Sequence, residues 1–488
     1  MASESVVCEN IGHRGRGRLA FTICAFVPAM LLFFPPLAFY KLPMQLQLYN
    51  GNVLVYPRSV WIAVGAAAAW FIIAIGAFWW PTNYTASPRS WRLPVAAGAF
   101  VWLSVIGSIV AVGTSVCHAP SILAELFHWV AFAPVVAVVI GVALYRQARA
   151  GVRVPLRAGL LPLLGALDLC AVVVLPIALA RVEPAAVAMI AIFYGLWVLG
   201  MPRRLLFLSL LALCCVTASA LPIKEFLRVA LYDNQPFVAR VCATAQTSVP
   251  LTNNVGPAIS NYPHLVAVSS PHTFGLKWPT LAGPPQYVQY TAARTVNRLN
   301  RLGDFAYVVQ TTPARIAYTN GITYLPIIGT FVPRVLWPTK PLNTGSGQFY
   351  GHRYGYLDPR DLSHSANLPI VTEGWMNHGW LGIILSAAVV GLVLRVIWQR
   401  WIGDGNALGN IMIGMAVMAT AVDQESSLGL LLGGVAHALV IYGVLAYLLS
   451  HAGWFQPRTE GIPSRKSRLD LVLNLVYRDE RGHAPPQD

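Results

Sequence analysis

The apolar residues of this chain fall in blocks of about 17–25 residues, the length at which a helix crosses a hydrocarbon core of about 30 Å. Charged residues make up only 11% of the sequence, against roughly a quarter in soluble domains. Because lipid offers no hydrogen-bond partners to main-chain N–H and C=O groups, a chain that crosses it must be helical there. The sequence therefore predicts an all-α polytopic membrane protein and argues against a soluble fold.

The blocks predict ten transmembrane helices, with one long loop between the seventh and the eighth. Their expected bounds are 19–40, 60–80, 94–115, 120–144, 158–180, 184–200, 205–221, 377–398, 407–422 and 427–449. The first block is too long for a signal peptide, and no small-residue cleavage site follows Tyr40. The chain then divides into a tail (1–18), helices one to seven (19–221), a large outer loop (222–376), helices eight to ten (377–449) and a basic tail (450–488).

The distribution of Lys and Arg predicts the orientation, because cytoplasmic loops carry an excess of positive charge. Nineteen of these residues lie in the two tails and in the loops after helices two, four, six and eight. Only Lys41, Arg58 and Arg181 lie in the alternate short loops. Both termini are therefore expected in the cytoplasm and the outer loop on the opposite side. Because the net charge of +15 follows from this topology, no nucleic-acid partner is expected.

The outer loop is too long to be structureless in a compact protein. A helix is predicted from Tyr287 to Val309, and Pro313 follows shortly after its end. The apolar and aromatic residues 314–332 predict a re-entrant or membrane-surface helix, and a Pro-, Gly- and Tyr-rich stretch follows to about residue 369. Twelve Lys and Arg residues against five Asp and Glu make residues 222–370 basic. That balance favours an anionic ligand such as a diphosphate or a lipid head group, although a solvated basic loop has the same composition.

Three arginines of the predicted helix have a spacing that places them together. Arg294, Arg298 and Arg301 stand at i, i+4 and i+7, so they share one helix face. Like charges repel unless an anion lies among them, and guanidinium groups suit phosphate because they donate parallel hydrogen bonds. A solvent-facing basic stripe is the alternative.

Two further segments have a distinctive sequence. Residues 333–341 read PRVLWPTKP and follow Tyr318, Gly321 and Tyr324, and residues 373–382 read EGWMNHGWLG at the start of the eighth helix. Together with Arg298 and Arg301, these segments resemble the Wzy-type polymerases of bacterial O-antigen and exopolysaccharide repeat units. The resemblance covers about residues 294–382; the rest of the chain matches only in helix number and topology.

The resemblance implies an enzyme of the bacterial inner membrane with the helical fold of C-type membrane glycosyltransferases. Such an enzyme polymerises undecaprenyl-diphosphate-linked oligosaccharide units into O-antigen or exopolysaccharide at the periplasmic face, with release of the lipid diphosphate. The implied partners are the lipid-linked oligosaccharide, membrane lipids and a chain-length regulator. A lipid-linked glycan ligase is an alternative, and a transporter of polysaccharide or lipid is an alternative from a different class, although no internal repeat supports a transporter.

The chemistry of that reaction selects candidate residues. The outer loop has no D-x-D-like metal pair, so neither a metal nor a cofactor is expected, and positive side chains must stabilise the leaving diphosphate. Arg334 is the predicted catalytic cation. The predicted diphosphate-binding residues are Arg294, Arg298, Arg301 and Lys340.

A base must also accept the proton of the attacking hydroxyl. Glu373 is the first candidate and His378 the second, although Glu373 could instead be an ordinary acidic residue near a helix N-terminus. The predicted substrate-binding residues are Tyr324, Trp337 and Asn377. Asp168, in the middle of the fifth predicted helix, must face the bundle, and an internal pairing is favoured there over catalysis.

Overall fold

The computed structural model describes most of the helical part of the chain. The described residues are 16–34, 44–48, 51–81, 93–116, 130–149, 160–178, 182–202, 204, 206–211, 301–330, 337, 345–361, 365–403, 408–422, 424 and 426–449. Three helices in this range are long and apolar enough to cross a membrane: Pro57–Trp79, Trp380–Ile402 and Leu428–Leu448. The fold is therefore that of a helical membrane protein, and the count of ten spans stays a prediction.

Helices occupy most of the predicted spans, with bounds shifted by a few residues. The helices of the first half are α1 (Arg16–Phe33), α3 (Pro57–Trp79), α4 (Leu93–Val116), α6 (Ala133–Arg149), α7 (Leu160–Leu169), the π-helical turn η1 (Cys170–Val174), α8 (Leu175–Ala178) and α9 (Val182–Val198). Those of the second half are α19 (Trp380–Ile397), the π-helical turn η3 (Trp398–Ile402), α20 (Leu408–Ala421) and α21 (Leu428–Leu449). Of the span predicted at 205–221, only residues up to 211 are described, and these are helical.

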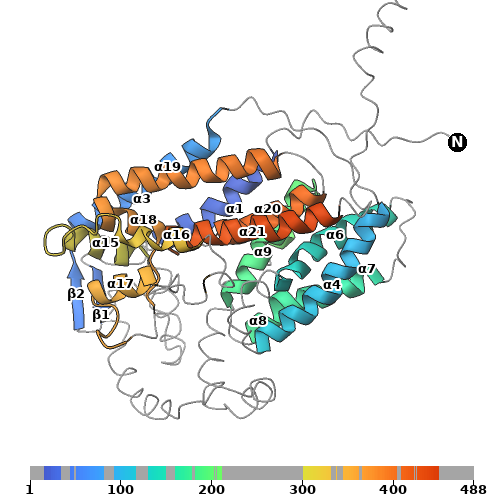
Figure 1. The fold of residues 1–488 in the computed structure, drawn as a ribbon, viewed down its shortest axis with the longest axis horizontal. Coiled ribbons are helices and arrows are strands. Elements are labelled where there is room, and N and C mark those ends of the chain that lie inside the picture. Colours follow the sequence, from blue (N-terminus) through green and yellow to red (C-terminus); the bar gives the residue numbers. More distant parts are fainter. Residues whose placement is uncertain are drawn as a thin grey trace, which may run out of the picture.

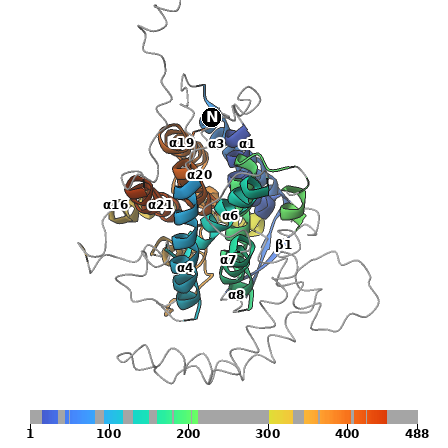
Figure 2. The same ribbon diagram turned by 90° about the vertical axis from the view of Figure 1, so that its right-hand side faces the viewer.

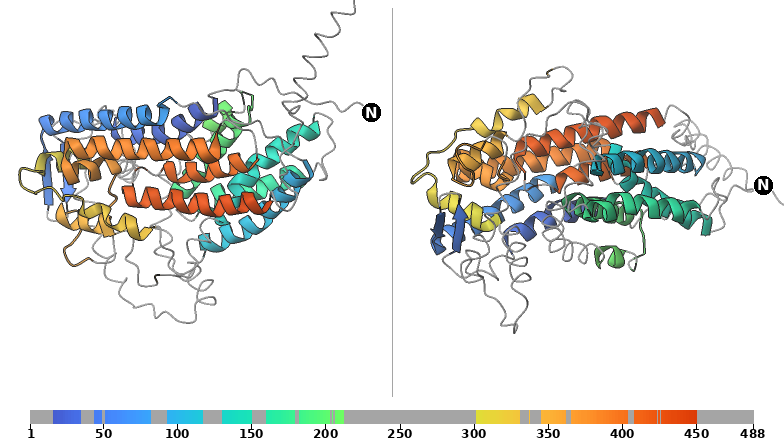
Figure 3. Two further views of the ribbon diagram at one scale, coloured as in Figure 1. Left: turned by 45° about the horizontal axis from the view of Figure 1, so that its top comes forward. Right: turned by 90° about the horizontal axis from the view of Figure 1, so that it is seen from below.

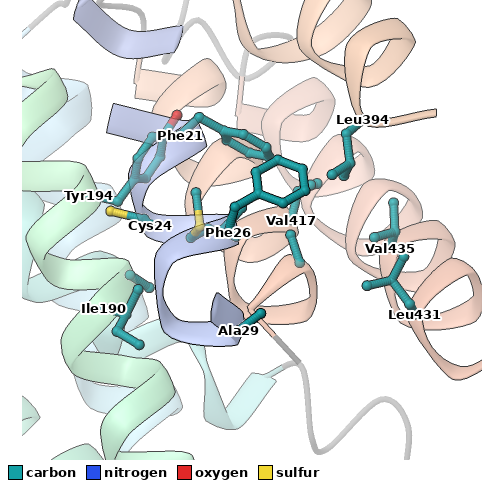
Figure 4. Close-up of a cluster of buried hydrophobic side chains, with 14 of the residues drawn as sticks. Phe21, Cys24, Phe26, Ala29, Ile190, Tyr194, Leu394, Val417, Leu431 and Val435 are labelled. Atoms are coloured by element: carbon teal, nitrogen blue, oxygen red, sulfur yellow. The ribbon is translucent and has the colours of Figure 1, made fainter. Parts of the chain in front are cut away.

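The helices form two groups that meet along α1 and α9. In the first group α3 packs along α19, and α1, α20 and α21 lie beside them; in the second group α4, α6 and α7 pack together with α9 (Figure 1, Figure 2). Figure 4 shows the contact between the groups, where Phe21 and Cys24 of α1 lie between Tyr194 of α9 and Val417 of α20. The centroids of the Phe21 and Tyr194 rings are 5.9 Å apart in an edge-on arrangement. This buried cluster joins helices that are distant in the sequence.

A β-hairpin corrects the expectation that the protein is entirely helical. Strands β1 (Met44–Leu48) and β2 (Gly51–Val55) pair antiparallel, with Met44 opposite Val55. Both strands have an apolar residue at alternate positions, which suits one covered face, and Gly51 has a φ of 126°, which favours glycine. This short pattern lies between two much stronger helical signals, and the loop was not expected to form strands.

The described parts of the outer loop assemble with this hairpin at one end of the helices. Helices α15 (Arg301–Thr311), α16 (Pro326–Thr330), α17 (Gly345–Arg353) and α18 (Ile370–His378) and the short 3-10 turn η2 (Ile322–Tyr324) all lie there (Figure 3). Gln310 of α15 links the hairpin to this assembly: its side chain donates to the Leu54 carbonyl at 2.9 Å and accepts from the Tyr56 N–H at 2.8 Å. We call β1, β2, α15, η2, α16, α17 and α18 together the end unit.

The opposite end of α3 binds arginines. Its last carbonyls have no partner inside the helix, and Arg18 of α1 donates to the carbonyls of Phe78 and Trp80. Arg395 of α19 donates to the Pro81 carbonyl at 3.0 Å. Cations are favourable at the negative end of a helix dipole. Arg18 and Arg395 thus lie together at the end of α3 away from the end unit. That this end faces the cytoplasm stays a prediction.

The structure corrects or completes what was expected of the outer loop and of the helix that follows it. Helix α15 confirms the predicted helix only over residues 301–309, since 287–300 lie outside the described range. The single helix predicted at 314–332 is wrong, because Asn320 and Gly321 have positive φ values of 50° and 89°, which interrupt a right-handed helix. Helix α17 lies in the Pro-, Gly- and Tyr-rich stretch, for which no particular element was predicted. Finally, the eighth predicted helix corresponds to α19, which begins at Trp380, and the separate helix α18 (Ile370–His378) precedes it across a break at Gly379.

Candidate functional site

The segment EGWMNHGWLG forms a helix–elbow–helix in which three glycines have separate tasks. Gly379 lies between α18 and α19 with φ 56° and ψ −131°, a conformation that other residues rarely adopt. A Cβ at Gly382 would collide with the Gly374 carbonyl oxygen, and a Cβ at Gly374 would lie 2.8 Å from the Ser386 hydroxyl oxygen. The glycines therefore let α18 fold back closely against the first turn of α19.

Asn377 holds a second segment, residues 319–324, against α18. Its side-chain oxygen accepts from the Thr319 hydroxyl at 2.6 Å and from the Gly321 N–H at 2.8 Å. Its side-chain nitrogen donates to the Thr323 hydroxyl oxygen at 2.7 Å and to the Glu373 carbonyl at 2.8 Å. Two lone pairs and two N–H groups are the full capacity of an amide side chain, and the residue is 0% exposed. Asn377 was expected to bind substrate, but in this structure it has no free group with which to do so.

Glu373 is buried where α18, η2 and the beginning of α21 meet. Its Oε2 atom accepts a hydrogen bond of 2.7 Å from the N–H of Leu428, the first residue of α21. Its Oε1 atom is buried and has no hydrogen-bond partner among the described residues. Burial raises the pKa of Glu373 to about 7, while the Leu428 N–H and the Thr323 hydroxyl act in the opposite direction. A carboxyl with such a pKa can accept or hold a proton near neutral pH.

The N-terminus of α21 explains how a buried carboxylate is tolerated here. The first N–H groups of a helix lack partners within it and form the positive end of its dipole. Glu373 was predicted to lie near the N-terminus of the helix that contains it, and it does lie in the first turn of α18. The helix that it caps, however, begins 55 residues later in the sequence. No local pattern around residue 373 signals that partner.

Helix α15 lies against α18 on another side. The rings of Phe305 and Trp375 make an edge-on contact at 6.3 Å, and the Trp375 indole N–H donates to the Thr312 carbonyl at 3.2 Å. Three segments that stand apart in the sequence, 301–312, 319–324 and 370–382, are thereby fixed to one another. The residues 333–341 that complete the resemblance lie outside the described range except for Trp337.

Arg301 is paired within the end unit. Its guanidinium lies 3.2 Å from the Asp304 carboxylate in an ion pair, with the two side chains 17% and 20% exposed. Burial raises the pKa of Asp304, and Arg301 opposes that shift. Arg301 was predicted to bind a diphosphate together with Arg294 and Arg298, which lie outside the described residues. In this structure a neighbouring carboxylate already balances its charge.

Four tyrosines make ring contacts with one another close to this ion pair. Tyr350 makes ring contacts with Tyr354 at 5.3 Å and with Tyr356 at 5.1 Å, and Tyr307 contacts Tyr354 at 6.3 Å. Tyr350 and Tyr354 are each only 1% exposed. Both are therefore core residues of the end unit.

The remaining candidates are less embedded. Tyr324 is half-buried in η2; burial raises the pKa of its hydroxyl, and the charge of Glu373 adds to that shift. His378, in the last turn of α18, is half-buried, and Trp337 is 41% exposed. Arg334 and Lys340 lie outside the described residues. The structure thus brings Glu373, Tyr324, Asn377 and His378 together on and beside α18, and it places Arg301 on the neighbouring helix α15.

The described part of the outer loop is electrically balanced. Its four arginines are matched by four carboxylates, and they are Arg301, Arg315, Arg353 and Arg360 against Asp304, Asp358, Asp361 and Glu373. The excess of positive charge in this loop is therefore carried by residues outside the described range. Among them are the predicted diphosphate-binding residues Arg294, Arg298 and Lys340 and the predicted catalytic Arg334.

Comparisons with known proteins found no matching family model, no matching curated protein and no matching solved structure.

Proposed function

We propose that this protein is a membrane glycosyltransferase that polymerises oligosaccharide units carried on undecaprenyl diphosphate. The reaction would take place at the periplasmic face of a bacterial inner membrane, with both termini of the chain in the cytoplasm. One observation carries the proposal: the segments 301–312, 319–324 and 370–382 form a single hydrogen-bonded unit around Glu373. These segments bear part of the sequence pattern on which the resemblance to Wzy-type polymerases rests, namely Arg301, Gly321, Tyr324 and residues 373–382.

In the proposed reaction the bond between the donor sugar and the lipid diphosphate breaks, and the diphosphate leaves with the electron pair. The acceptor hydroxyl bonds to the anomeric carbon, and its proton passes to a base. Oε1 of Glu373 is our candidate for that base, because Oε2 is engaged with the Leu428 N–H and Oε1 is not engaged. A pKa of about 7 suits proton transfer at neutral pH. Arg334, Arg294, Arg298 and Lys340 would stabilise the diphosphate charge. Arg301, already paired with Asp304, ranks behind them.

The burial of Glu373 sets a condition on this mechanism. The residue is 0% exposed, so an acceptor hydroxyl reaches Oε1 only after one of the segments packed against α18 has moved. Segment 319–324 is held mainly by hydrogen bonds to Asn377, whereas α15 is held by aromatic contacts and α21 by the cap from Glu373. We therefore propose that segment 319–324 moves to admit the acceptor.

The test is polymerisation by the purified full chain in lipid vesicles supplied with undecaprenyl-diphosphate-linked oligosaccharide. A ladder of lengthened chains on a gel is the expected result. Glu373→Gln keeps an oxygen to accept the Leu428 N–H but cannot take up a proton, so we expect a rate loss of about 10²-fold or more. Arg334→Ala should also stop chain growth, while Arg360→Ala, which removes an exposed arginine of the same loop, is the matched control.

The products separate the rival functions. A single transfer with no lengthening would indicate a lipid-linked glycan ligase, and movement of intact lipid-linked substrate across the vesicle without any transfer would indicate a transporter. If Glu373→Gln and Arg334→Ala both polymerised normally at equal protein abundance, the proposed site would be wrong.

A further inference from the structure

Asp168 is a second buried carboxylate, far from the end unit in the other group of helices. It lies in α7, two residues before the π-helical turn η1, and it is 0% exposed. The hydroxyls of Ser104 and Ser108, one turn apart on α4, donate to its Oδ1 atom at 2.8 Å and 3.0 Å. This confirms the expectation that Asp168 faces the bundle and is paired internally.

The second oxygen of Asp168 has no such partner. Oδ2 is buried and makes no hydrogen bond to any described residue. The elements packed against α7 contribute mainly apolar residues to the buried core, among them Leu103 of α4, Val136 and Ile140 of α6 and Ala171 of η1. Both serines are also buried, at 0% and 4% exposure. The carboxyl group is therefore in an apolar interior with only half of its hydrogen-bonding capacity used.

No described cation lies near enough to pair with Asp168. Helices α4, α6, α8 and α9 pack on α7 or η1. No described side chain of α4 or α8 is ionisable. Helix α6 has only Tyr145, Arg146 and Arg149, all exposed near its C-terminal end, with Arg146 donating to the sulfur of Met201. In α9 the Tyr194 hydroxyl is directed at Gly414 of α20, and the Glu183 side chain is not described. Cys170 of η1 is exposed.

A buried carboxylate without a counter-ion is far more costly than a buried neutral carboxyl group. Two neutral hydroxyls reduce that cost, but they do not supply a positive charge. Carboxyl groups held inside apolar helices typically mark proton or ion sites, and π-helical turns such as η1 occur frequently at functional sites. The lack of a described counter-ion, the burial and the neighbouring π-helical turn thus all indicate a site that binds a proton or a cation.

We propose that Asp168 binds a proton on Oδ2, and that Asp168, Ser104 and Ser108 form a proton-binding site inside the second helix group. Oδ1 keeps its two serine hydrogen bonds in both protonation states, so the proton can leave without loss of these contacts. The site is separate from the proposed glycosyl-transfer site and does not depend on that function.

The test is labelling with dicyclohexylcarbodiimide, an apolar reagent that enters lipid and reacts with protonated carboxyl groups. The carboxyl proton moves to a nitrogen of the reagent while the carboxyl oxygen bonds to its central carbon, and the adduct rearranges to a stable N-acylurea. We expect mass spectrometry of peptides from the intact folded protein to show this adduct on Asp168 at acidic and neutral pH. Labelling should decrease as the pH is raised, and Asp168→Asn should abolish it.

A double variant, Ser104→Ala with Ser108→Ala, tests the geometry. The hydroxyls stabilise the charged form more than the neutral form, so their removal should move the loss of labelling upward by about one pH unit. An unchanged midpoint would contradict the serine assignment. Protection of Asp168 by Na⁺, but not by an equal concentration of choline, would replace the proton site with a metal-cation site and overturn the proposal.

Thermal unfolding of the wild type and Asp168→Asn decides the matter if the reagent does not reach the site. A folded state that holds the proton more tightly than the unfolded state loses stability as pH rises. The wild type should therefore match Asp168→Asn at low pH and become less stable than this variant at high pH. If Asp168→Asn is instead less stable at every pH, Asp168 is a structural anion and the proposal is wrong.

Discussion

Glu373 and Asp168 are two buried carboxylates in different parts of one molecule. Each has one oxygen in hydrogen bonds and the other without a partner among the described residues. Glu373 is bound by a main-chain N–H at the start of α21, in an end unit built from four short helices, a turn and a hairpin. Asp168 is bound by two side-chain hydroxyls between long apolar helices.

The difference indicates what each carboxylate can do. The N-terminus of α21 brings a partial positive charge to Glu373, so its charged form is supported by a dipole that no single substitution removes. Among the described residues Asp168 has only neutral donors, so its charged form is supported less. The end unit also contains turns that can move, whereas α4, α6 and α7 are packed along their lengths. Glu373 therefore suits a reaction with a substrate, and Asp168 suits the binding of a proton.

The largest expected effect comes from Gly382→Ala, which disturbs the packing of α18 around Glu373 and leaves the surroundings of Asp168 unchanged. The added methyl group collides with the Gly374 carbonyl, so we expect a loss of about 3 kcal/mol of stability or more. Gly443→Ala is the matched control, since its Cβ would meet no atom within 4 Å. Unfolding midpoints measure both variants. Carbodiimide labelling of Asp168 at sub-denaturing temperature should be unchanged, and loss of that labelling would show that the two sites are coupled.

Next in size is the pH dependence conferred by Glu373. Because burial raises the pKa of Glu373 from 4.5 to about 7 in the folded state, the folded protein binds this proton more tightly than the unfolded chain. Its contribution to stability is thus fully present below pH 4.5 and is lost as pH rises to 7, by roughly 3 kcal/mol in total.

Glu373→Gln should remove this slope of the unfolding free energy against pH. Unfolding at a series of pH values measures it. The activity should change in the opposite sense, rising toward pH 8 as the base ionises. A wild-type slope equal to that of the glutamine variant would mean that Glu373 does not titrate in this range.

A somewhat smaller loss is expected for Asn377→Ala. The substitution leaves the Gly321 N–H and the Thr319 hydroxyl without their acceptor and frees segment 319–324, at a cost of about 2 kcal/mol. Proteolysis between residues 318 and 325 should accelerate, while Asn377→Asp, which keeps the two acceptor sites, should be cleaved more slowly than the alanine variant. Equal protection of wild type and Asn377→Ala would show that other contacts hold this segment.

The smallest effect is expected for Ser104→Ala on the Asp168 side. Ser108 still donates to Oδ1, and a protonated carboxyl group needs less support than an anion, so the loss should be about 1 kcal/mol or less. The unfolding midpoint near pH 6 measures it. A loss as large as that for Asn377→Ala would indicate that Asp168 is ionised and depends on its serines.

The helices were the predictable part of this structure. Helices α3, α19 and α21 stand within a few residues of the predicted spans because long apolar blocks have one solution in lipid. The burial of Asp168 followed from the same rule. The break at Gly379 had a visible signal, since three glycines within nine residues are unusual in a segment that otherwise reads as helical. The hairpin at 44–55 had only a weak one.

The sequence predicted which residues belong to the candidate site, but it did not predict their contacts. Glu373, Tyr324 and Asn377 were chosen from the sequence pattern, and they do lie close together. The sequence did not indicate that all four polar sites of Asn377 are used internally or that Arg301 is paired with Asp304. Thr319 and Thr323, which hold the turn beside Glu373, were missed because a single threonine in a loop has no distinguishing pattern.

The sequence by itself determined where this chain is helical, since the length and apolar character of a block decide whether it suits lipid. It also determined that Asp168 lies inside the helix bundle, whereas the full burial of Glu373 emerged only in the structure. Only the tertiary structure decided which group each of them meets: a helix N-terminus 55 residues away for Glu373, and two serines 60 and 64 residues away for Asp168. The reason is that hydrophobic burial depends on the apolar character of each side chain, whereas hydrogen bonds depend on the relative positions of atoms from separate helices.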